Sequence, residues 1–257
     1  VQGLADTLRT LDAHGTLDGL PFMPEMMEFC GERFHVMRRV EKLNDYIDMR
    51  GFRRMRNVVM LDGLRCSGEF HGHCQSNCHL RWNEAWLRRA EAEATPAPIE
   101  PPPVEAEVPP VHKAAGENAP FFCQATELTS NSTQLSHGDP RVYIRELLVG
   151  NVRLRPFLVG VSLAIFNWVQ GRRGGVGFPA LLPTGGKTSL MQTLDLQVGE
   201  SVRIKAKHDI ELTLNDRGRN RGLWFDVDML RYCGGEYTVQ ARVERVIKEK
   251  TGDLMHL

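Results

Sequence analysis

Three cysteines and three histidines fall within fourteen residues of this chain, in the segment CSGEFHGHCQSNCH, residues 66–79. Thiolate sulfur and imidazole nitrogen are ligands that zinc prefers in proteins, and a structural zinc site takes four such ligands in a tetrahedron. The segment is polar and contains glycine, so it has little apolar surface to hold it in one conformation. A metal ion or a disulfide would supply the missing cross-link.

The predicted metal ligands are four cysteines. Cys66, Cys74 and Cys78 lie in the segment, with the spacing C-x7-C-x3-C. Cys30 is the fourth, because it ends a predicted helical turn just before a predicted strand. The reserve ligands are histidines of the same segment: His73, His71 and His79. Four protein ligands leave no position open for a substrate, so we predict a structural zinc ion.

Four alternatives stay open for the same residues. Thiolates also hold iron–sulfur clusters, and cysteine pairs form disulfides in an oxidising compartment. The run CQSNCH, residues 74–79, is one residue longer than the c-type haem attachment motif C-x-x-C-H. Free thiols are the fourth alternative, because cysteine is often buried without a partner.

Charge and hydropathy restrict the class of partner. The 257 residues include 32 Lys plus Arg and 32 Asp plus Glu, so the formal net charge is zero. This balance disfavours partners held mainly by charge, such as duplex DNA or an anionic membrane. The one membrane-like run, FLVGVSLAIFNWV at residues 157–169, has thirteen residues, whereas a spanning helix needs about twenty. We expect a buried helix there, no transmembrane segment, and a cytoplasmic protein.

Composition divides the chain into four parts. Residues 93–118 are rich in proline, alanine and glutamate, which predicts an extended, semi-stiff linker. Before it, residues 1–92 are expected to form a β-rich module that carries the cysteine cluster. After it, we expect a helical insert at residues 119–187 and a second β-rich module at residues 188–257.

An internal repeat relates the two β-rich modules. Residues 10–42, TLDAHGTLDGLPFMPEMMEFCGERFHVMRRVEK, align without a gap with residues 213–245, TLNDRGRNRGLWFDVDMLRYCGGEYTVQARVER, at an offset of 203. Two copies of one small fold are the expected meaning. The second copy is predicted to be incomplete, since it has no counterpart of the cysteine loop. Cys233, which matches Cys30, belongs either to an incomplete second site or to the core.

Short strands, tight turns and one helical turn in each copy predict an α+β protein with two small, SH3-like barrels. The run RFHVMRRVEK, residues 33–42, alternates between apolar and polar residues, which predicts a strand with Phe34, Val36 and Val40 facing the core. Trp82 and Trp86 are four residues apart. We therefore expect them on one face of a helix that packs on the barrel and shields the cysteine site.

Several motifs resemble a bacterial protein family to which no activity is assigned. They are MPEM with FCG in the first copy, LDGLRCSGEFHGHCQSNC and WNEAWL after it, and RNRGLWFDVDMLRYCGGEY in the second copy. The resemblance covers both copies and most of the chain. It implies that Cys30, Cys66, Cys74 and Cys78 act as a unit, and that the C-terminal copy continues into a cysteine loop of its own. It implies nothing about a substrate.

No complete catalytic motif is legible, so the sequence leaves open whether the protein is an enzyme. LLPTGGKTS, for example, has Leu181 where a phosphate-binding loop has its first glycine. The favoured function is a non-catalytic, metal-stabilised binding or scaffold subunit with a protein partner, which it meets through the helical insert and the linker. One alternative is an enzyme or redox accessory protein with its cofactor at the cysteines. A weaker one is a nucleic-acid-binding small barrel that uses the arginine-rich residues 50–56 and 216–224.

Overall fold

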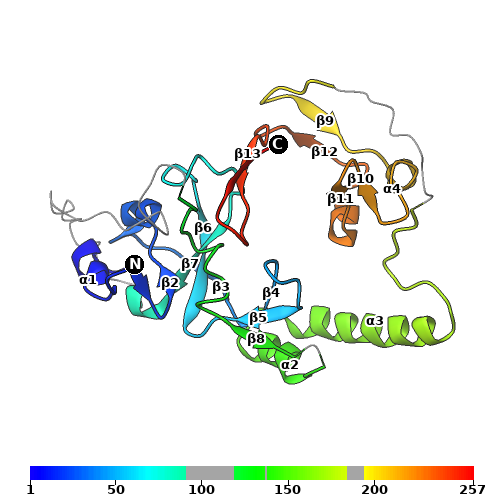
Figure 1. Ribbon diagram of the computed structural model, residues 1–257. Helices are drawn as coiled ribbons and strands as arrows, with labels where there is room; N and C mark the ends of the chain where they lie inside the picture. The colour runs from blue at the N-terminus through cyan, green and yellow to red at the C-terminus, as the bar shows by residue number, and fades with distance from the viewer. Residues whose placement is uncertain (91–118, 137, 184–193) are drawn as a thin grey trace. The chain divides into compact units, whose positions relative to one another are not determined.

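The computed structural model confirms the α+β class, with small antiparallel sheets and a few helices in the described part of the chain (Figure 1). The structure describes residues 1–90, 119–136, 138–183 and 194–257. The predicted linker, residues 93–118, lies outside the described residues.

The described residues form two units. Unit 1 consists of Val1–Leu154 together with Val243–Leu257, and unit 2 consists of Arg155–Arg242. No sheet among the described strands closes into a barrel. The SH3-like barrel therefore stays a prediction.

Two three-stranded antiparallel sheets organise unit 1. In one sheet β6 lies between β3 and β7, and in the other β5 lies between β4 and β8. The strands of unit 1 are β1 (Thr16–Leu17), β2 (Leu20–Pro21), β3 (Val36–Arg39), β4 (Leu43–Asn44), β5 (Phe52–Arg54), β6 (Val58–Arg65), β7 (His79–Asn83), β8 (Thr133–Leu135), β13 (Arg245–Ile247) and β14 (Leu254–His256). Its helices are α1 (Leu4–Leu8), the 3-10 turns η1 (Pro24–Phe29) and η2 (Glu84–Trp86), and α2 (Arg141–Leu148).

Strand β3 departs from its predicted pattern. Val36 is 57% exposed, whereas Val40 is buried as expected. The pairing of β3 with β6 shifts register between Val36 and Arg38. A bulge of this kind interrupts the alternation of side chains between the two faces of a strand. Of the predicted inward face, Val40 is therefore buried and Phe34 packs against the core, whereas Val36 is turned to the surface.

Aromatic side chains form the centre of the unit 1 core. Trp82 and Trp86 are each 0% exposed. The ring of Phe22 meets both edge-on, with centroid distances of 6.3 Å to Trp82 and 5.2 Å to Trp86. The predicted shared helix is wrong, because Trp82 lies in β7 and Trp86 in η2. The strand and the following turn nevertheless bring both rings to the same core.

Unit 2 contains the apolar helix α3 (Leu154–Arg172), whose first residue belongs to unit 1, and a set of short elements. The short elements are β9 (Ser201–Arg203), α4 (Lys207–Glu211), β10 (Arg219–Asn220), β11 (Leu223–Trp224), η3 (Val227–Tyr232) and β12 (Glu236–Thr238). The helix expected at residues 157–169 is present within α3, but its expected burial is not found, because no side chain of α3 is buried by the described residues. None of the helices described in the structure has the length and apolar character needed to span a membrane.

Four elements recur in unit 2 at the offset of the sequence repeat. The elements α4, β10, β11 and η3 each begin 203 residues after α1, β1, β2 and η1. The backbone N–H of Phe22 donates to the carbonyl of Gly15 at 3.0 Å, and that of Phe225 donates to the carbonyl of Gly218 at 3.1 Å. Both 3-10 turns are capped at their C-terminal end by a cysteine, Cys30 in one and Cys233 in the other.

Candidate metal centre

Two separate segments of unit 1 supply the candidate centre. The first is η1, where Pro24 occupies an early position that suits its fixed φ and where Glu25 is buried. The second is the loop between β6 and β7, which is closed by a hydrogen bond from the Cys66 N–H to the Cys78 carbonyl at 2.8 Å. Gly68 is required within the loop, because it has a φ of +73° and a Cβ there would lie 2.0 Å from the carbonyl oxygen of Cys74.

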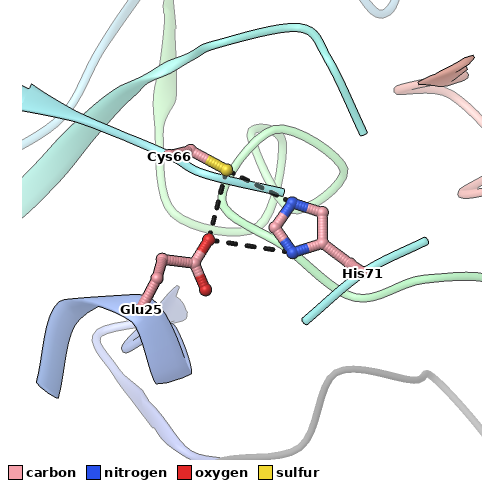
Figure 2. A group of neighbouring side chains, drawn as sticks. All are labelled: Glu25, Cys66 and His71. Carbon is pink, nitrogen blue, oxygen red and sulfur yellow. Dashed lines mark hydrogen bonds and ion pairs between the residues drawn. The ribbon is translucent and has the colours of Figure 1, made fainter. Parts of the chain in front are cut away.

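Glu25, Cys66 and His71 bring their ligand atoms together (Figure 2). The Cys66 thiol donates to Glu25 Oε1 at 3.1 Å, and its Sγ lies 3.3 Å from His71 Nε2. His71 Nδ1 lies 3.7 Å from the same Glu25 oxygen. One ligand atom from each residue lies within 4.8 Å of the others, so the group could hold a metal ion.

Burial makes this group costly without a cation. The side chains of Glu25 and His71 are each 2% exposed. Glu25 Oε2 and His71 Nδ1 are buried and have no hydrogen-bond partner among the described residues. A buried carboxylate is strongly unfavourable unless it is paired or coordinates a metal. A metal ion bound at this position would relieve that cost.

The pKa values describe the group in the absence of an ion. Burial raises the pKa of the Cys66 thiol far above its ordinary value of 9.0, and the neighbouring Glu25 carboxylate raises it further. Burial lowers the pKa of His71 below 6.5, although Glu25 opposes this shift. At neutral pH the ion-free group therefore holds a protonated thiol and a neutral imidazole. Such a thiol is a poor nucleophile, since the thiolate is the reactive form.

The structure places the predicted ligands in different surroundings. Cys66, Cys74 and Cys78 line one cavity together with His71 and His79. Cys30 is absent from the residues lining that cavity, and its thiol donates to the Met26 carbonyl at 3.8 Å. His73, the first reserve ligand, is exposed. Among the described residues the four cysteines do not form a group with all ligand atoms within 4.8 Å, so the four-thiol set stays a prediction.

Glu25 and Cys123 are the site residues that the sequence reasoning missed. Glu25 carried a signal, since it is a charged residue inside the otherwise apolar run FMPEMM, residues 22–27. Cys123 carried none, because it lies beyond the predicted linker and lacks a neighbouring ligand in the sequence. Yet it lines the same cavity as Cys66, Cys74 and Cys78. All six cysteines of the chain are free thiols in the structure.

The fold and the site together define an α+β protein with a buried glutamate–cysteine–histidine group beside a thiol-lined cavity. Comparison of the chain with protein-family models, with curated proteins and with solved structures finds no match.

Proposed function

We propose that the protein is a non-catalytic, metal-stabilised binding or scaffold subunit, and that zinc is held by Glu25, Cys66 and His71. The observation that carries the proposal is the meeting of these three donors within 4.8 Å. They come from a 3-10 turn and from a loop 41 residues further along the chain. An ion bound to all three would fasten the loop to the turn, which is the work of a structural zinc site.

The surface of α3 supports the protein partner in this proposal. Leu158, Ile165 and Trp168 are 54%, 59% and 60% exposed. A helix that is apolar on all sides is normally covered by other protein or by lipid. A cytoplasmic location fits the six free thiols, because reducing compartments preserve thiols.

Duplication of a small β-rich module is the fold part of the proposal. Its support is the recurrence of α1, β1, β2 and η1 in unit 2 at the offset of the aligned repeat. The two three-stranded sheets of unit 1 are compatible with a small, SH3-like module, although their described strands leave the sheets open.

An enzyme or redox accessory protein is the second candidate. The observation that favours it is the ligand count: three protein ligands leave one position of a zinc tetrahedron free, as in catalytic sites. The adjoining cavity, lined by four cysteines, offers further donors. In a site of this kind, the chemistry would be supplied by a water molecule bound at the free position of the metal or by a redox-active metal.

Elemental analysis combined with visible absorption spectroscopy tests the proposal. The purified protein should contain zinc and be colourless, and a chelator should lower its melting temperature because metal binding and folding are coupled. Strong visible absorption would instead indicate an iron–sulfur cluster or haem and would favour the second candidate. Protein free of metal whose melting temperature does not respond to added zinc would refute a structural metal.

A further inference from the structure

The cavity beside the Glu25–Cys66–His71 group is lined by four of the six cysteines. Cys66 shares in that group, whereas Cys74, Cys78 and Cys123 face the cavity without belonging to it. Cys74 and Cys123 are each 6% exposed. Three further thiols therefore gather at one place in unit 1, although they come from both sides of the predicted linker.

A buried glutamine holds the segment of Cys123 against β7. Gln124 Oε1 accepts a hydrogen bond from the Arg81 N–H at 2.8 Å. Gln124 Nε2 donates to the carbonyls of Arg81 at 2.8 Å and Pro21 at 2.9 Å. These bonds fix the backbone next to Cys123, so the place of this thiol in the cavity is determined by the fold.

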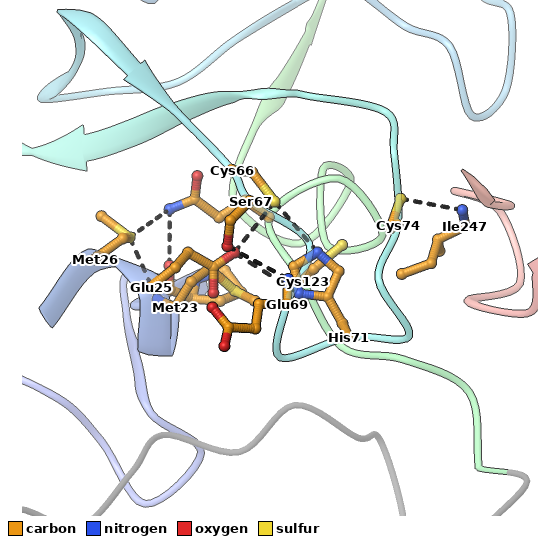
Figure 3. Close-up of polar contacts among 12 residues, drawn as sticks. Met23, Glu25, Met26, Cys66, Ser67, Glu69, His71, Cys74, Cys123 and Ile247 are labelled. Carbon is orange, nitrogen blue, oxygen red and sulfur yellow. Dashed lines mark hydrogen bonds and ion pairs between the residues drawn. The ribbon is translucent and has the colours of Figure 1, made fainter. Parts of the chain in front are cut away.

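Two polar groups offset part of the cost of holding thiolates in this buried cavity. The backbone N–H of Ile247 in β13 donates to Cys74 Sγ at 3.3 Å (Figure 3). Hydrogen bonds to the ligand atoms are a regular feature of metal sites and stabilise the ligand in its charged form. The Arg81 side chain also lines the cavity. Burial raises the pKa of Cys78 to about 11, and the positive charge of Arg81 opposes that shift.

We propose that Cys74, Cys78 and Cys123 form a thiolate site for a thiophilic closed-shell metal ion such as zinc, separate from the Glu25–Cys66–His71 group. Three thiolates and one further donor complete a tetrahedron, and His79, which is outside that group, lines the same cavity. At least one pair of the three sulfur atoms lies more than 4.8 Å apart, so the ion draws the loop of residues 66–78 towards Cys123. Metal binding deprotonates each thiol, and the protons pass to solvent.

A metal ion at this site would join residues that precede the predicted linker to a residue that follows it. Cys74 and Cys78 precede residues 93–118 in the chain, whereas Cys123 follows them. Ile247 of β13, far along the chain, already contacts Cys74. The ion would therefore join two segments of unit 1 that the sequence keeps far apart, beside a third that already contacts Cys74.

Titration of the metal-free full-length chain with Co(II) and Cd(II) tests this site. Co(II) bound to thiolates gives an ultraviolet charge-transfer band whose intensity rises with the number of sulfur ligands. We expect two Cd(II) ions per wild-type chain. Cys123→Ser should lose one Cd(II) and most of the Co(II) charge-transfer intensity. Cys30→Ser is the matched control, because Cys30 is also buried but is not among the residues lining the cavity, and it should behave as wild type.

The double variant Glu25→Gln/His71→Gln separates the two proposals. It should lose the other Cd(II) and keep most of the charge-transfer intensity. Loss of both ions in this variant, with none lost in Cys123→Ser, would overturn the thiolate site and leave the site of the proposed function standing. A Cys123→Ser protein that binds two Cd(II) ions with an unchanged Co(II) spectrum would also overturn it.

Alkylation of the wild-type protein tests the site without any substitution, so the result cannot arise from a variant that fails to fold. Cd(II) should slow the alkylation of Cys74, Cys78 and Cys123 at least tenfold, as measured by mass spectrometry of peptides. The rate at Cys30 should be the same with and without Cd(II). Equal effects of Cd(II) at Cys123 and Cys30 would contradict the proposal.

Discussion

The Cys66 thiol donates a 3.1 Å hydrogen bond to the Glu25 carboxylate, although the two residues are 41 positions apart in the chain. The contact joins the loop between β6 and β7 to the turn η1, and His71 lies beside both groups. It places a buried acid against a half-buried thiol, an arrangement that is unfavourable until a cation is shared between them. The stability of unit 1 should therefore depend on metal, on pH and on the few residues that hold these segments together.

Alkaline pH should destabilise the metal-free protein. Burial raises the pKa of Cys78 from 9.0 to about 11. A raised pKa means that the folded state keeps its proton longer, so the contribution to stability is complete below pH 9 and is lost as the pH rises towards 11. We expect a loss of about 1 kcal/mol by pH 10 from this thiol. Urea unfolding of the metal-free protein at pH 8 and pH 10 measures it, with Cys78→Ser as the control that should lose less.

A buried ion pair should be needed for stability. Arg53 Nη1 lies 3.0 Å from Asp45 Oδ2, and the Asp45 side chain is 0% exposed. Asp45→Asn leaves the arginine buried without its anion, which should cost about 3 kcal/mol of unfolding free energy. The exposed Asp62→Asn, the control, should change it by less than about 0.5 kcal/mol. Equal unfolding free energies for the two variants would contradict the pairing.

Acid should weaken the same pair. Burial alone would raise the pKa of Asp45, but the N–H of Asp48 and the Arg53 guanidinium together lower it below 3.8. A lowered pKa gives stability that is present above the ordinary pKa and is lost as the pH falls through the lowered value. The wild-type protein should therefore lose more stability than Asp45→Asn between pH 5 and pH 3 in urea unfolding. If Asp45→Asn loses as much unfolding free energy as wild type between pH 5 and pH 3, Asp45 contributes nothing to the loss of stability in acid.

Equivalent positions of the repeat should differ in their sensitivity to mutation. Leu20 is 1% exposed, whereas Leu223, its counterpart in the alignment, is 75% exposed. Leu20→Ala removes buried apolar volume and should cost about 3 kcal/mol. Leu223→Ala should cost less than about 0.5 kcal/mol. Chemical denaturation of both variants decides the matter, and a large loss at Leu223 would mean that its face is covered in the protein in solution.

Gln124 should be important for the stability of unit 1, because its loss leaves several buried backbone groups unpaired. Gln124→Ala leaves the buried Arg81 N–H and two carbonyls without partners, which should cost about 3 kcal/mol. The matched control is Gln134→Ala, whose side chain makes one exposed hydrogen bond to the Arg50 carbonyl. The control should leave the melting temperature close to that of wild type. Indistinguishable melting temperatures for the two variants would show that the Gln124 hydrogen bonds do not stabilise the fold.

Local features of the chain were predictable from the sequence. The helical turn predicted to end at Cys30 is present as η1, and the strand predicted in residues 33–42 contains β3. The α+β class follows from such short elements and their turn residues. Part of the ligand group was also foreseen, since Cys66 was a predicted ligand and His71 a reserve. All of these predictions depend on residues that are near one another in the chain.

Contacts between distant segments were not predictable. The approach of Glu25 to Cys66 depends on how η1 packs beside the β6–β7 loop, and spacing in the sequence does not contain that information. The same is true of Cys123, which Gln124 positions through bonds to Arg81 and Pro21. The bulge in β3 is a further example, because strict alternation gives no sign of the register shift that exposes Val36.

The zinc content of two glutamate variants tests the central claim most directly. Glu25 and Glu28 lie in the same turn, but Glu25 is buried beside Cys66 whereas Glu28 is exposed. Elemental analysis of Glu25→Gln should find one zinc fewer per chain than in wild type, together with a lower melting temperature, and Glu28→Gln should match wild type in both. A Glu25→Gln protein that retains the wild-type zinc content and melting temperature would contradict a metal centre at Glu25, Cys66 and His71.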